Sequence, residues 1–433
     1  NGIVLAETTP FGRVYQQRHL YFQILGGGGG SFETPYGLEY WLQPLLFGMS
    51  PERTRNTTDR IKLATAGQDV VLTFDTRLQI ATSTLLLKKG YRGCVVVIEP
   101  QSGEILAAVS APSYDKLTFR YQDWVRLTNA DPTVPPNCFR SRYAPGSTFK
   151  TLIAAAAVEA GRFSYTQSFS CMGHWLPQVN RPAVHCHGVH GSRTLEKALP
   201  PSCNCIYAQA GVALGYEHVF RYADTHAGFN TPIALLPAHW RNLHDEVWCE
   251  TNPSWLWPQW NSARKIWEPV PFPELIPRGE LDRFALAQTA FGQRNVRMTP
   301  VHLAVWGGTL ANDGTMMRPT IIKAVGQWRN KPEVWDISLS STTARWIEEG
   351  MLRVMTDREG TAKAVNVPSL EIAGKTGTAD DPATGTKTLF IGYAPASKPM
   401  LAVAVVLENQ HESDMSAAKL AVDLFRIAQQ LRR

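Results

Sequence analysis

The chain has 433 residues and a formal net charge of +6, from 43 basic and 37 acidic side chains. Hydrophobic residues make up 44% and charged residues 18%, which argues against bulk disorder, and the length allows a large domain plus a smaller one. The weak, scattered positive charge does not predict nucleic-acid binding, although it is compatible with an anionic surface such as a membrane or a cell-wall polymer. We find no run of about 18 apolar residues, so the chain as given is not expected to span a membrane.

Residues 1–68 are loosely patterned and predict a small N-terminal module. They begin abruptly in an apolar segment, so we expect that an N-terminal membrane anchor has been removed. Residues 26–31 are five glycines and a serine, a composition typical of a flexible link. This link is either a natural glycine-rich loop or an artificial joint that replaces a deleted piece.

A regular pattern starts near Asp69, and residues 69–433 are predicted to form one large domain. A strand, a helix capped by Asp75 and a β-hairpin come first, over residues 69–74, 76–89, 94–98 and 105–109. The next helix is expected to start at Ser147. Because residues 151–158 are apolar around the whole helix, this helix should be buried inside the domain.

Residues 163–200 are irregular, and the regular pattern then returns in short segments. We predict helices at 194–199, 205–214, 284–291, 299–312, 341–355 and 415–430, and strands at 372–378, 389–393 and 401–407. Helices before and after hairpin-connected strands indicate an α+β fold with an antiparallel sheet.

A long insertion rich in proline and tryptophan runs from His226 to Arg283. Six of the 13 tryptophans fall between Trp240 and Trp267, which sets this segment apart from the rest of the chain. A loop of this length is usually functional, so one interpretation is that it borders the substrate groove or meets a partner. The other is surface elaboration with a small aromatic core of its own.

Three short motifs carry reactive side chains: Ser147-Thr-Phe-Lys150, Ser202-Cys-Asn204 and Lys375-Thr-Gly-Thr378. Residues three apart lie on one face of a helix, so the hydroxyl of Ser147 and the amine of Lys150 should lie side by side. A buried lysine loses the solvation of its charge, its pKa falls, and its neutral amine can take a proton from serine. Each motif alone is a weak signal, but the three in this order predict an acyl-transfer site.

The second motif and Lys375 can assist the proton transfers of such a site. Ser202 can relay a proton between Lys150 and a leaving amine, and Asn204 can hold both the lysine and a substrate amide. Lys375 adds positive potential.

The rest of the third motif can bind the substrate. Gly377 lets the strand backbone approach the substrate without a side chain in the way. The N–H groups of Thr378 and Ser147 would form an oxyanion hole. The hydroxyls of Thr376 and Thr378 suit a carboxylate.

These motifs and their surroundings resemble the transpeptidase domain of a class B penicillin-binding protein of the penicillin-binding protein 2 type. The resemblance covers roughly residues 69–433, and the N-terminal part matches more thinly and is short for the family's pedestal. No segment resembles a glycosyltransferase domain. The supporting stretches are residues 95–107, 110–115, 290–293, 298–300, 311–314, 360–362 and 390–395.

The resemblance implies the fold of the penicillin-binding and serine β-lactamase-like enzymes, in a periplasmic or extracytoplasmic domain tethered by an N-terminal helix missing here. It implies a peptidoglycan D,D-transpeptidase, in which Ser147 attacks the penultimate D-Ala of a stem peptide and an amine of a neighbouring strand resolves the acyl-enzyme. β-Lactam antibiotics would acylate the same serine. Relatives of this kind often work beside a polytopic glycan polymerase of the shape, elongation, division and sporulation type. The acyl transfer itself requires no cofactor.

Two other classes of function are compatible with the motifs. In a serine β-lactamase or D,D-carboxypeptidase, water resolves the acyl-enzyme; the N-terminal module and the long second half argue against a compact β-lactamase. A β-lactam sensor or scaffold would keep the fold and only bind.

Seven cysteines are an odd number, which in an oxidising compartment leaves at least one unpaired unless a ligand protects thiols. Cys94, Cys138 and Cys249 look isolated in the sequence, and we interpret them as small core residues. The other four lie in or beside the irregular, histidine-rich segment and the second motif.

One arrangement of these four is a metal site. Because Ser202 and Asn204 face the substrate, Cys203 between them should point into the protein behind. Three thiolates and one imidazole make a closed tetrahedral zinc site, which would fix a segment with little core of its own. The predicted ligands are Cys171, Cys186, His190 and Cys203.

The resemblance adds that some relatives carry ligating side chains at corresponding places, including the histidine of a His-Gly pair like His190-Gly191. The competing ligands are His174, His187 and Cys205. The main alternative is a Cys171–Cys186 disulfide, which would be natural outside the cytoplasm.

Overall fold

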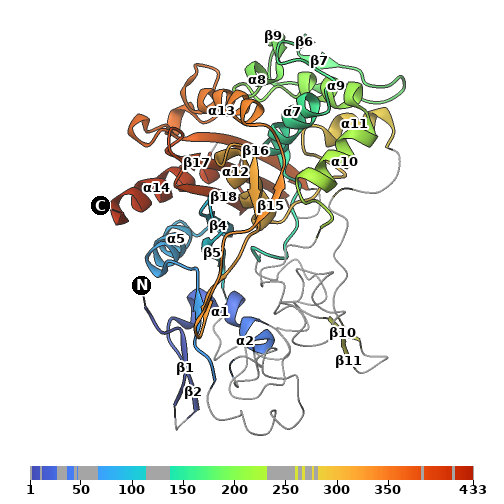
Figure 1. Ribbon diagram of the computed structural model, residues 1–433. Coiled ribbons are helices and arrows are strands. Elements are labelled where there is room, and N and C mark those ends of the chain that lie inside the picture. The colour runs from blue at the N-terminus through green and yellow to red at the C-terminus, as the bar shows by residue number, and fades with distance from the viewer. Residues whose placement is uncertain are drawn as a thin grey trace.

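The structure is a computed structural model, and it describes residues 2–9, 12–26, 37–42, 46, 67–113, 137–231, 259–261, 266–268, 276, 281–381, 385–411 and 415–432. At its centre is a five-stranded antiparallel sheet with the order β16-β17-β18-β4-β5 (Figure 1). Its strands are β4 Arg92–Ile98, β5 Ile105–Ala111, β16 Ala373–Asp381, β17 Gly385–Ala394 and β18 Leu401–Glu408. The fold is α+β, as predicted.

Helices surround this sheet, and short strands make small sheets beside it. The helices are α1 Arg18–Leu25, α2 Leu38–Trp41, α5 Thr76–Lys88, α7 Lys150–Glu159, α8 Leu195–Ala198, α9 Asn204–Leu214, α10 Tyr216–His226, α11 Arg283–Thr289, α12 Pro300–Ala311, α13 Ser341–Thr356 and α14 Ser416–Leu431, with the 3₁₀ helices η1 Gly146–Phe149, η4 Lys363–Val365 and η5 Pro368–Leu370. The remaining strands are β1 Ala6–Thr9, β2 Gly12–Tyr15, β3 Val70–Leu72, β6 Ser168–Cys171, β7 His174–Trp175, β8 Val184–His185, β9 Gly191–Thr194, β10 Gln259–Asn261, β11 Ile266–Glu268, β12 Thr315–Met317, β13 Ile322–Val325, β14 Trp328–Arg329 and β15 Val334–Ile337.

The central strands are apolar without alternation because both faces of the sheet are covered. Along β4, residues 93–98 are all buried, as are residues 401–407 of β18. The helices α5 and α14 pack together against β5, β17 and β18, whereas α12 packs against β4, β17 and β18 and contacts α13. A sheet enclosed in this way carries continuous hydrophobic runs rather than a polar outer face.

The most buried helix is α12, whose twelve residues are all buried. It begins at Pro300, a favourable residue for the first helical position, and the Thr299 side chain accepts a hydrogen bond from the N–H of His302. Gly307 and Gly308 face Ile391 and Ile98 of the sheet, at distances where an added Cβ atom would make ordinary van der Waals contact. Because α12 is apolar all round, it can form the interior layer between the sheet and the helical region that includes α7 and α9.

Most of the predicted elements are confirmed within a few residues. The N-cap of α5 is Asp75, which accepts a hydrogen bond of 2.9 Å from the N–H of Arg77. The predicted hairpin is β4 and β5, and the three late strands are β16 to β18. The strand predicted at 69–74 is β3, which pairs with β13 in a separate small sheet.

Two expectations need correction. Ser147 lies in the 3₁₀ turn η1, and the α-helix proper begins at Lys150. Residues 163–200 are not wholly irregular, since they form the short pairs β6–β9 and β7–β8. Cys94 and Cys138 are buried core residues, as predicted, and both thiols lie beside the Ser110 hydroxyl, at 3.7 and 3.3 Å.

The N-terminal elements β1, β2, α1 and α2 lie below the sheet in Figure 1. Residues 27–31 of the glycine-rich stretch, Cys249 and most of the tryptophan-rich insertion lie outside the described residues. The described part of the insertion includes the β10–β11 pair. Within the described residues, no helix is long and apolar enough to cross a bilayer. The predicted boundary near residue 69 stays a prediction.

Candidate active site

The Ser147 turn is shaped by a glycine that no other residue could replace without strain. Gly146 has a φ of +53°, in the region that favours glycine. A Cβ atom at this position would lie 2.4 Å from the carbonyl oxygen of Thr378 on β16. Pro145 and Gly146 therefore place Ser147 directly beside the third motif, with its side chain half-buried.

The amine of Lys150 lies among four oxygen atoms from the first two motifs. Its Nζ is 2.9 Å from Ser147 Oγ, 2.7 Å from Asn204 Oδ1, and 2.6 and 3.2 Å from the carbonyl oxygen and Oγ of Ser202. A neutral amine has two N–H donors and one lone pair. The carbonyl of Ser202 and the amide oxygen of Asn204 can only accept, so they take the two N–H groups. The lone pair is then left for the hydroxyl proton of Ser147.

Burial favours this neutral form. Lys150 is fully buried, and loss of solvation lowers its pKa from 10.5 to about 8, although the neighbouring thiols of Cys203, Cys186 and Cys205 act in the opposite direction. Burial also lowers the pKa of Lys375 well below its ordinary value, and the nearby Lys150 lowers it further. A state in which both lysines are charged is therefore unfavourable, because both are buried and their like charges repel.

Ser202 connects the two lysines. Its Oγ lies 3.0 Å from Nζ of Lys375 and 3.2 Å from Nζ of Lys150. Ser202 itself is a non-glycine residue with a φ of +54°, a conformation that is uncommon and often found at functional sites. This turn allows the Ser202 carbonyl and hydroxyl to face the same amine.

Asn204 is held in place from two sides. Its Oδ1 accepts from Lys150, and its Nδ2 donates to the carbonyl of His185 at 3.2 Å. The side chains of Ser147, Asn204, Thr376 and Thr378 are half-buried, whereas Lys150, Ser202 and Lys375 are buried. The reactive hydroxyl and the predicted binding groups are thus the more accessible ones.

The third motif lies on β16, an edge strand of the central sheet. The carbonyl of Thr378 accepts a hydrogen bond from outside the sheet, from Gln293 Nε2 at 2.9 Å. A residue of an antiparallel strand turns its N–H and C=O to the same side, so the N–H of Thr378 also points away from β17. This N–H and that of Ser147 can form the predicted oxyanion hole.

Gly377 packs against the Ser147 turn, and its predicted role beside the substrate stays a prediction. A Cβ atom there would lie 2.9 Å from the carbonyl oxygen of Pro145 and 3.0 Å from Cγ2 of Thr148. The close approach that requires glycine is therefore made by the Ser147 turn.

Gln293 and Thr361 contact motif residues with their side chains although neither belongs to a motif. The Oγ1 of Thr361 is 2.6 Å from that of Thr376, and its N–H donates to the carbonyl of Pro200. Both residues lie in stretches that support the family resemblance, 290–293 and 360–362, but the resemblance gives them no role. The local signal is only that both side chains are polar, because the sequence does not show what they contact.

The four predicted metal ligands come together. The Sγ atoms of Cys171 and Cys186 lie 3.6 and 3.3 Å from Nδ1 of His190, and Cys186 Sγ lies 3.6 Å from Cys203 Sγ. All four ligand atoms lie within 4.8 Å of one another. Zinc bonds of about 2.3 Å to sulfur and about 2.0 Å to nitrogen give tetrahedral ligand separations of about 3.5–3.8 Å, so the donor set fits zinc.

The competing residues are not among these four mutually close ligands, although the thiol of Cys205 interacts with those of Cys186 and Cys171. The thiol of Cys205 donates to the carbonyl of Val184 at 3.5 Å, and the side chains of His174 and His187 are exposed. All six described cysteines are free thiols. The N–H of Asn204 donates to Cys186 Sγ at 3.3 Å, so the cluster directly contacts the second motif.

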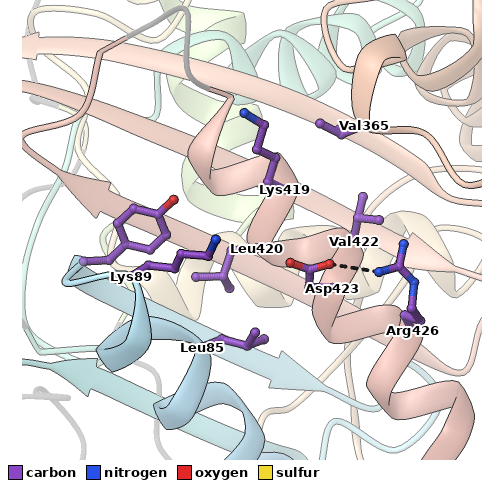
Figure 2. A pocket seen from close by; sticks show the side chains of 9 residues that line it. Leu85, Lys89, Val365, Lys419, Leu420, Val422, Asp423 and Arg426 are labelled. Atoms are coloured by element: carbon purple, nitrogen blue, oxygen red, sulfur yellow. Dashed lines mark hydrogen bonds and ion pairs between the residues drawn. The ribbon is translucent and has the colours of Figure 1, made fainter.

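A separate hollow of about 190 Å³ lies between α5, α14 and η4 (Figure 2). Its polar lining includes Lys89, Lys419 and an ion pair between Arg426 and Asp423. None of the three motifs borders this hollow, so it is not the acyl-transfer site.

The family model of the penicillin binding protein transpeptidase domain matches residues 93–426, and the chain belongs to this family. It is 30% identical over 343 residues to the peptidoglycan D,D-transpeptidase PbpA of Mycolicibacterium smegmatis, covering 73% of this chain and 62% of that protein. It is 28% identical over 391 residues to the peptidoglycan D,D-transpeptidase MrdA of Acinetobacter baumannii, covering 83% of this chain and 54% of that protein.

A solved structure with the same fold is penicillin-binding protein A from M. tuberculosis as a penicillin G acyl-enzyme complex. It is 25% identical, with a TM-score of 0.74 over 100% of this chain and 97% of that one. The predicted membership of the class B penicillin-binding proteins is confirmed. The chain spans between half and two thirds of the length of the two curated relatives.

The lowered pKa of Lys150 predicts how the reactivity of Ser147 toward a chromogenic β-lactam depends on pH. Below a pH of about 8 the amine is protonated and cannot accept the serine proton, so the acylation rate should rise about tenfold per pH unit and level off above that value. Lys150→Arg keeps the charge but does not deprotonate, and should slow acylation by about 10²–10⁴-fold. A stopped-flow profile without this rise, or near-normal acylation by Lys150→Arg, would mean that Lys150 is not the base.

Proposed function

We propose that this protein is a peptidoglycan D,D-transpeptidase that works through an acyl-enzyme on Ser147 and is a target of β-lactams. The observation that carries the proposal is the position of Lys150, whose Nζ lies 2.9 Å from the Ser147 hydroxyl while two oxygens that can only accept surround its other sides. The names of the two curated relatives and the penicillin G complex of a third support the same chemistry.

In the first step Ser147 Oγ attacks the penultimate D-Ala carbonyl of a stem peptide, and its proton passes to Nζ of Lys150. The N–H groups of Ser147 and Thr378 stabilise the oxyanion. The peptide C–N bond then breaks, and the leaving D-Ala amine takes the proton of Ser202 Oγ, which is replaced from Lys150. The carboxylate of the leaving D-Ala would meet the hydroxyls of Thr376 and Thr378 and the positive potential of Lys375.

In the second step the amine of a neighbouring stem peptide attacks the acyl carbon, the ester bond to Ser147 Oγ breaks, and the proton lost by the amine returns to Ser147 through Ser202 and Lys150. Asn204 holds Lys150 and can hold the substrate amide. A β-lactam would follow the first step only, because its amide nitrogen stays attached after the ring opens. Hydrolysis in place of the second step would make the protein a β-lactamase or D,D-carboxypeptidase.

We also propose the cellular setting that the family resemblance implies. The domain would lie outside the cytoplasm, in the periplasm where there is one, and would be anchored by a membrane helix. A polytopic glycan polymerase of the shape, elongation, division and sporulation type would supply the glycan strands to be cross-linked. Membership of the penicillin-binding protein family supports both the location and the polymerase partner.

A structural zinc ion is the proposed cofactor, with Cys171, Cys186, His190 and Cys203 as ligands. It would supply a cross-link and no step of the acyl transfer. Its place behind the second motif supports this role, because Cys203 lies between Ser202 and Asn204 in the chain. Three separations of 3.3–3.6 Å among the ligand atoms suit a tetrahedral ion, and the free thiols of Cys171 and Cys186 favour it over a disulfide between them.

Incubation with penicillin G should add one covalent adduct per chain, located on Ser147, and Ser147→Ala should remove it. Intact-mass spectrometry and peptide mapping measure both. A D-Ala-D-Ala peptide and an amine acceptor should then yield the transpeptidation product. An adduct that persists in Ser147→Ala would overturn the assignment of the nucleophile. Rapid, continuous nitrocefin turnover would favour the β-lactamase.

Purified protein should contain about one zinc per chain, measured by elemental mass spectrometry. Cys186→Ser should lose the metal and much of the acylation rate, since this sulfur also accepts from the N–H of Asn204. Cys205→Ser is the matched control and should keep the metal. Metal-free protein with a mass two hydrogens below the fully reduced value would show the disulfide instead.

A further inference from the structure

Gln293 makes a hydrogen bond that none of the three motifs accounts for. Its side-chain Nε2 donates to the carbonyl of Thr378 at 2.9 Å, across 85 positions of sequence. This carbonyl faces outward from the edge strand β16, where no further strand among the described residues pairs with it. Thr378 is also the residue whose N–H is assigned to the oxyanion hole, so Gln293 contacts a residue that would stabilise the oxyanion directly.

The bond constrains the direction of that N–H. In an antiparallel strand the N–H and C=O of one residue point to the same side, and each follows the rotation of the strand at that residue. A donor held against the carbonyl therefore limits how far the N–H can turn. The Gln293 side chain is half-buried, which restricts its own movement.

The residue before Gln293 holds the other half of the oxyanion hole. The carbonyl of Gly292 accepts from the N–H of Gly146 at 2.9 Å, and Gly146 directly precedes Ser147. A Cβ atom on Gly292 would lie 1.9 Å from the carbonyl oxygen of Gly146. These two backbone segments can therefore lie this close only because Gly292 has no side chain. Two consecutive residues thus contact both segments that supply the oxyanion N–H groups.

We propose that Gln293 is a positioning residue that sets the separation of the Ser147 and Thr378 N–H groups for acyl transfer. It acts through Thr378 and does not touch the reacting atoms. This inference rests on the proposed transpeptidase function. A purely structural role predicts lower stability or a smaller active fraction. Positioning predicts a slower acylation step in protein that is folded and fully titratable.

The test compares Gln293→Glu and Gln293→Met with Gln288→Glu by stopped-flow acylation with a chromogenic β-lactam. Gln288 lies in the same segment, and its Oε1 accepts from Arg294 at 3.2 Å, so Gln288→Glu makes the same chemical change away from the site. Burst amplitudes report the active fraction. The rate constant at saturation is separated from the binding constant, and both are followed from a pH of about 8 to about 5.

At the higher pH, Gln293→Glu and Gln293→Met should lower the saturating rate constant by about 10–100-fold with a full burst, somewhat less than removal of an oxyanion donor. As the pH falls, the protonated glutamic acid of Gln293→Glu can donate to the Thr378 carbonyl. Its rate relative to the parent protein should therefore recover, while that of Gln293→Met stays low and that of Gln288→Glu stays near one.

Parent-like rates in Gln293→Met, or a deficit of Gln293→Glu that does not change with pH, would overturn the inference. Both outcomes differ from failure of the proposed function. If the proposed function were wrong, the parent protein itself would form no adduct on Ser147.

Discussion

The amine of Lys150 is bound by groups from segments far apart in the chain, and the chemistry of the site depends on this contact. Ser147 comes from the η1 turn, whereas Ser202 and Asn204 come from the start of α9. The surrounding acceptors take both N–H groups of the neutral amine and leave its lone pair to the serine. Because burial removes water, this arrangement lowers the pKa of Lys150 to about 8 and makes it a base near neutral pH.

The fold supports this contact with close backbone packing. Gly146, Gly292 and Gly377 bring the Ser147 turn, the segment after α11 and β16 so near to one another that a side chain at any of them would overlap backbone atoms. A helix that is buried on all sides carries Lys150, so its side chain has no route to solvent. The same close packing that keeps the amine neutral also brings the Ser147 turn against the backbone of Thr378.

The metal-ligand cluster extends this support to the second motif. Cys203 turns inward while its neighbours Ser202 and Asn204 turn toward Lys150. The segment from Cys171 to His190 forms only two short strand pairs with β9 and within itself, so few backbone bonds hold it. In the proposed zinc site, cross-linking by four side chains would take the place of a hydrophobic core behind the motif.

The residues predicted from local spacing were found where they were expected. The i, i+3 spacing of Ser147 and Lys150 and the alternation around Cys203 are properties of a single segment, so the sequence is sufficient to place them. Helix α10 was not predicted, although Val219, Tyr222 and Ala223 have helical spacing and are buried. The contacts of Gln293 and Thr361 could not be predicted, because they depend on how distant loops pack against the edge of the sheet.

The central claim is that Ser147 is the nucleophile and that its own N–H and that of Thr378 hold the oxyanion. The most direct measurement is a crystal structure of the protein after reaction with penicillin G. The account predicts a bond from Ser147 Oγ to the opened β-lactam carbonyl, whose oxygen lies about 2.7–3.1 Å from the nitrogens of Ser147 and Thr378. An acyl group on another residue, or a carbonyl oxygen turned away from these two nitrogens, would contradict it.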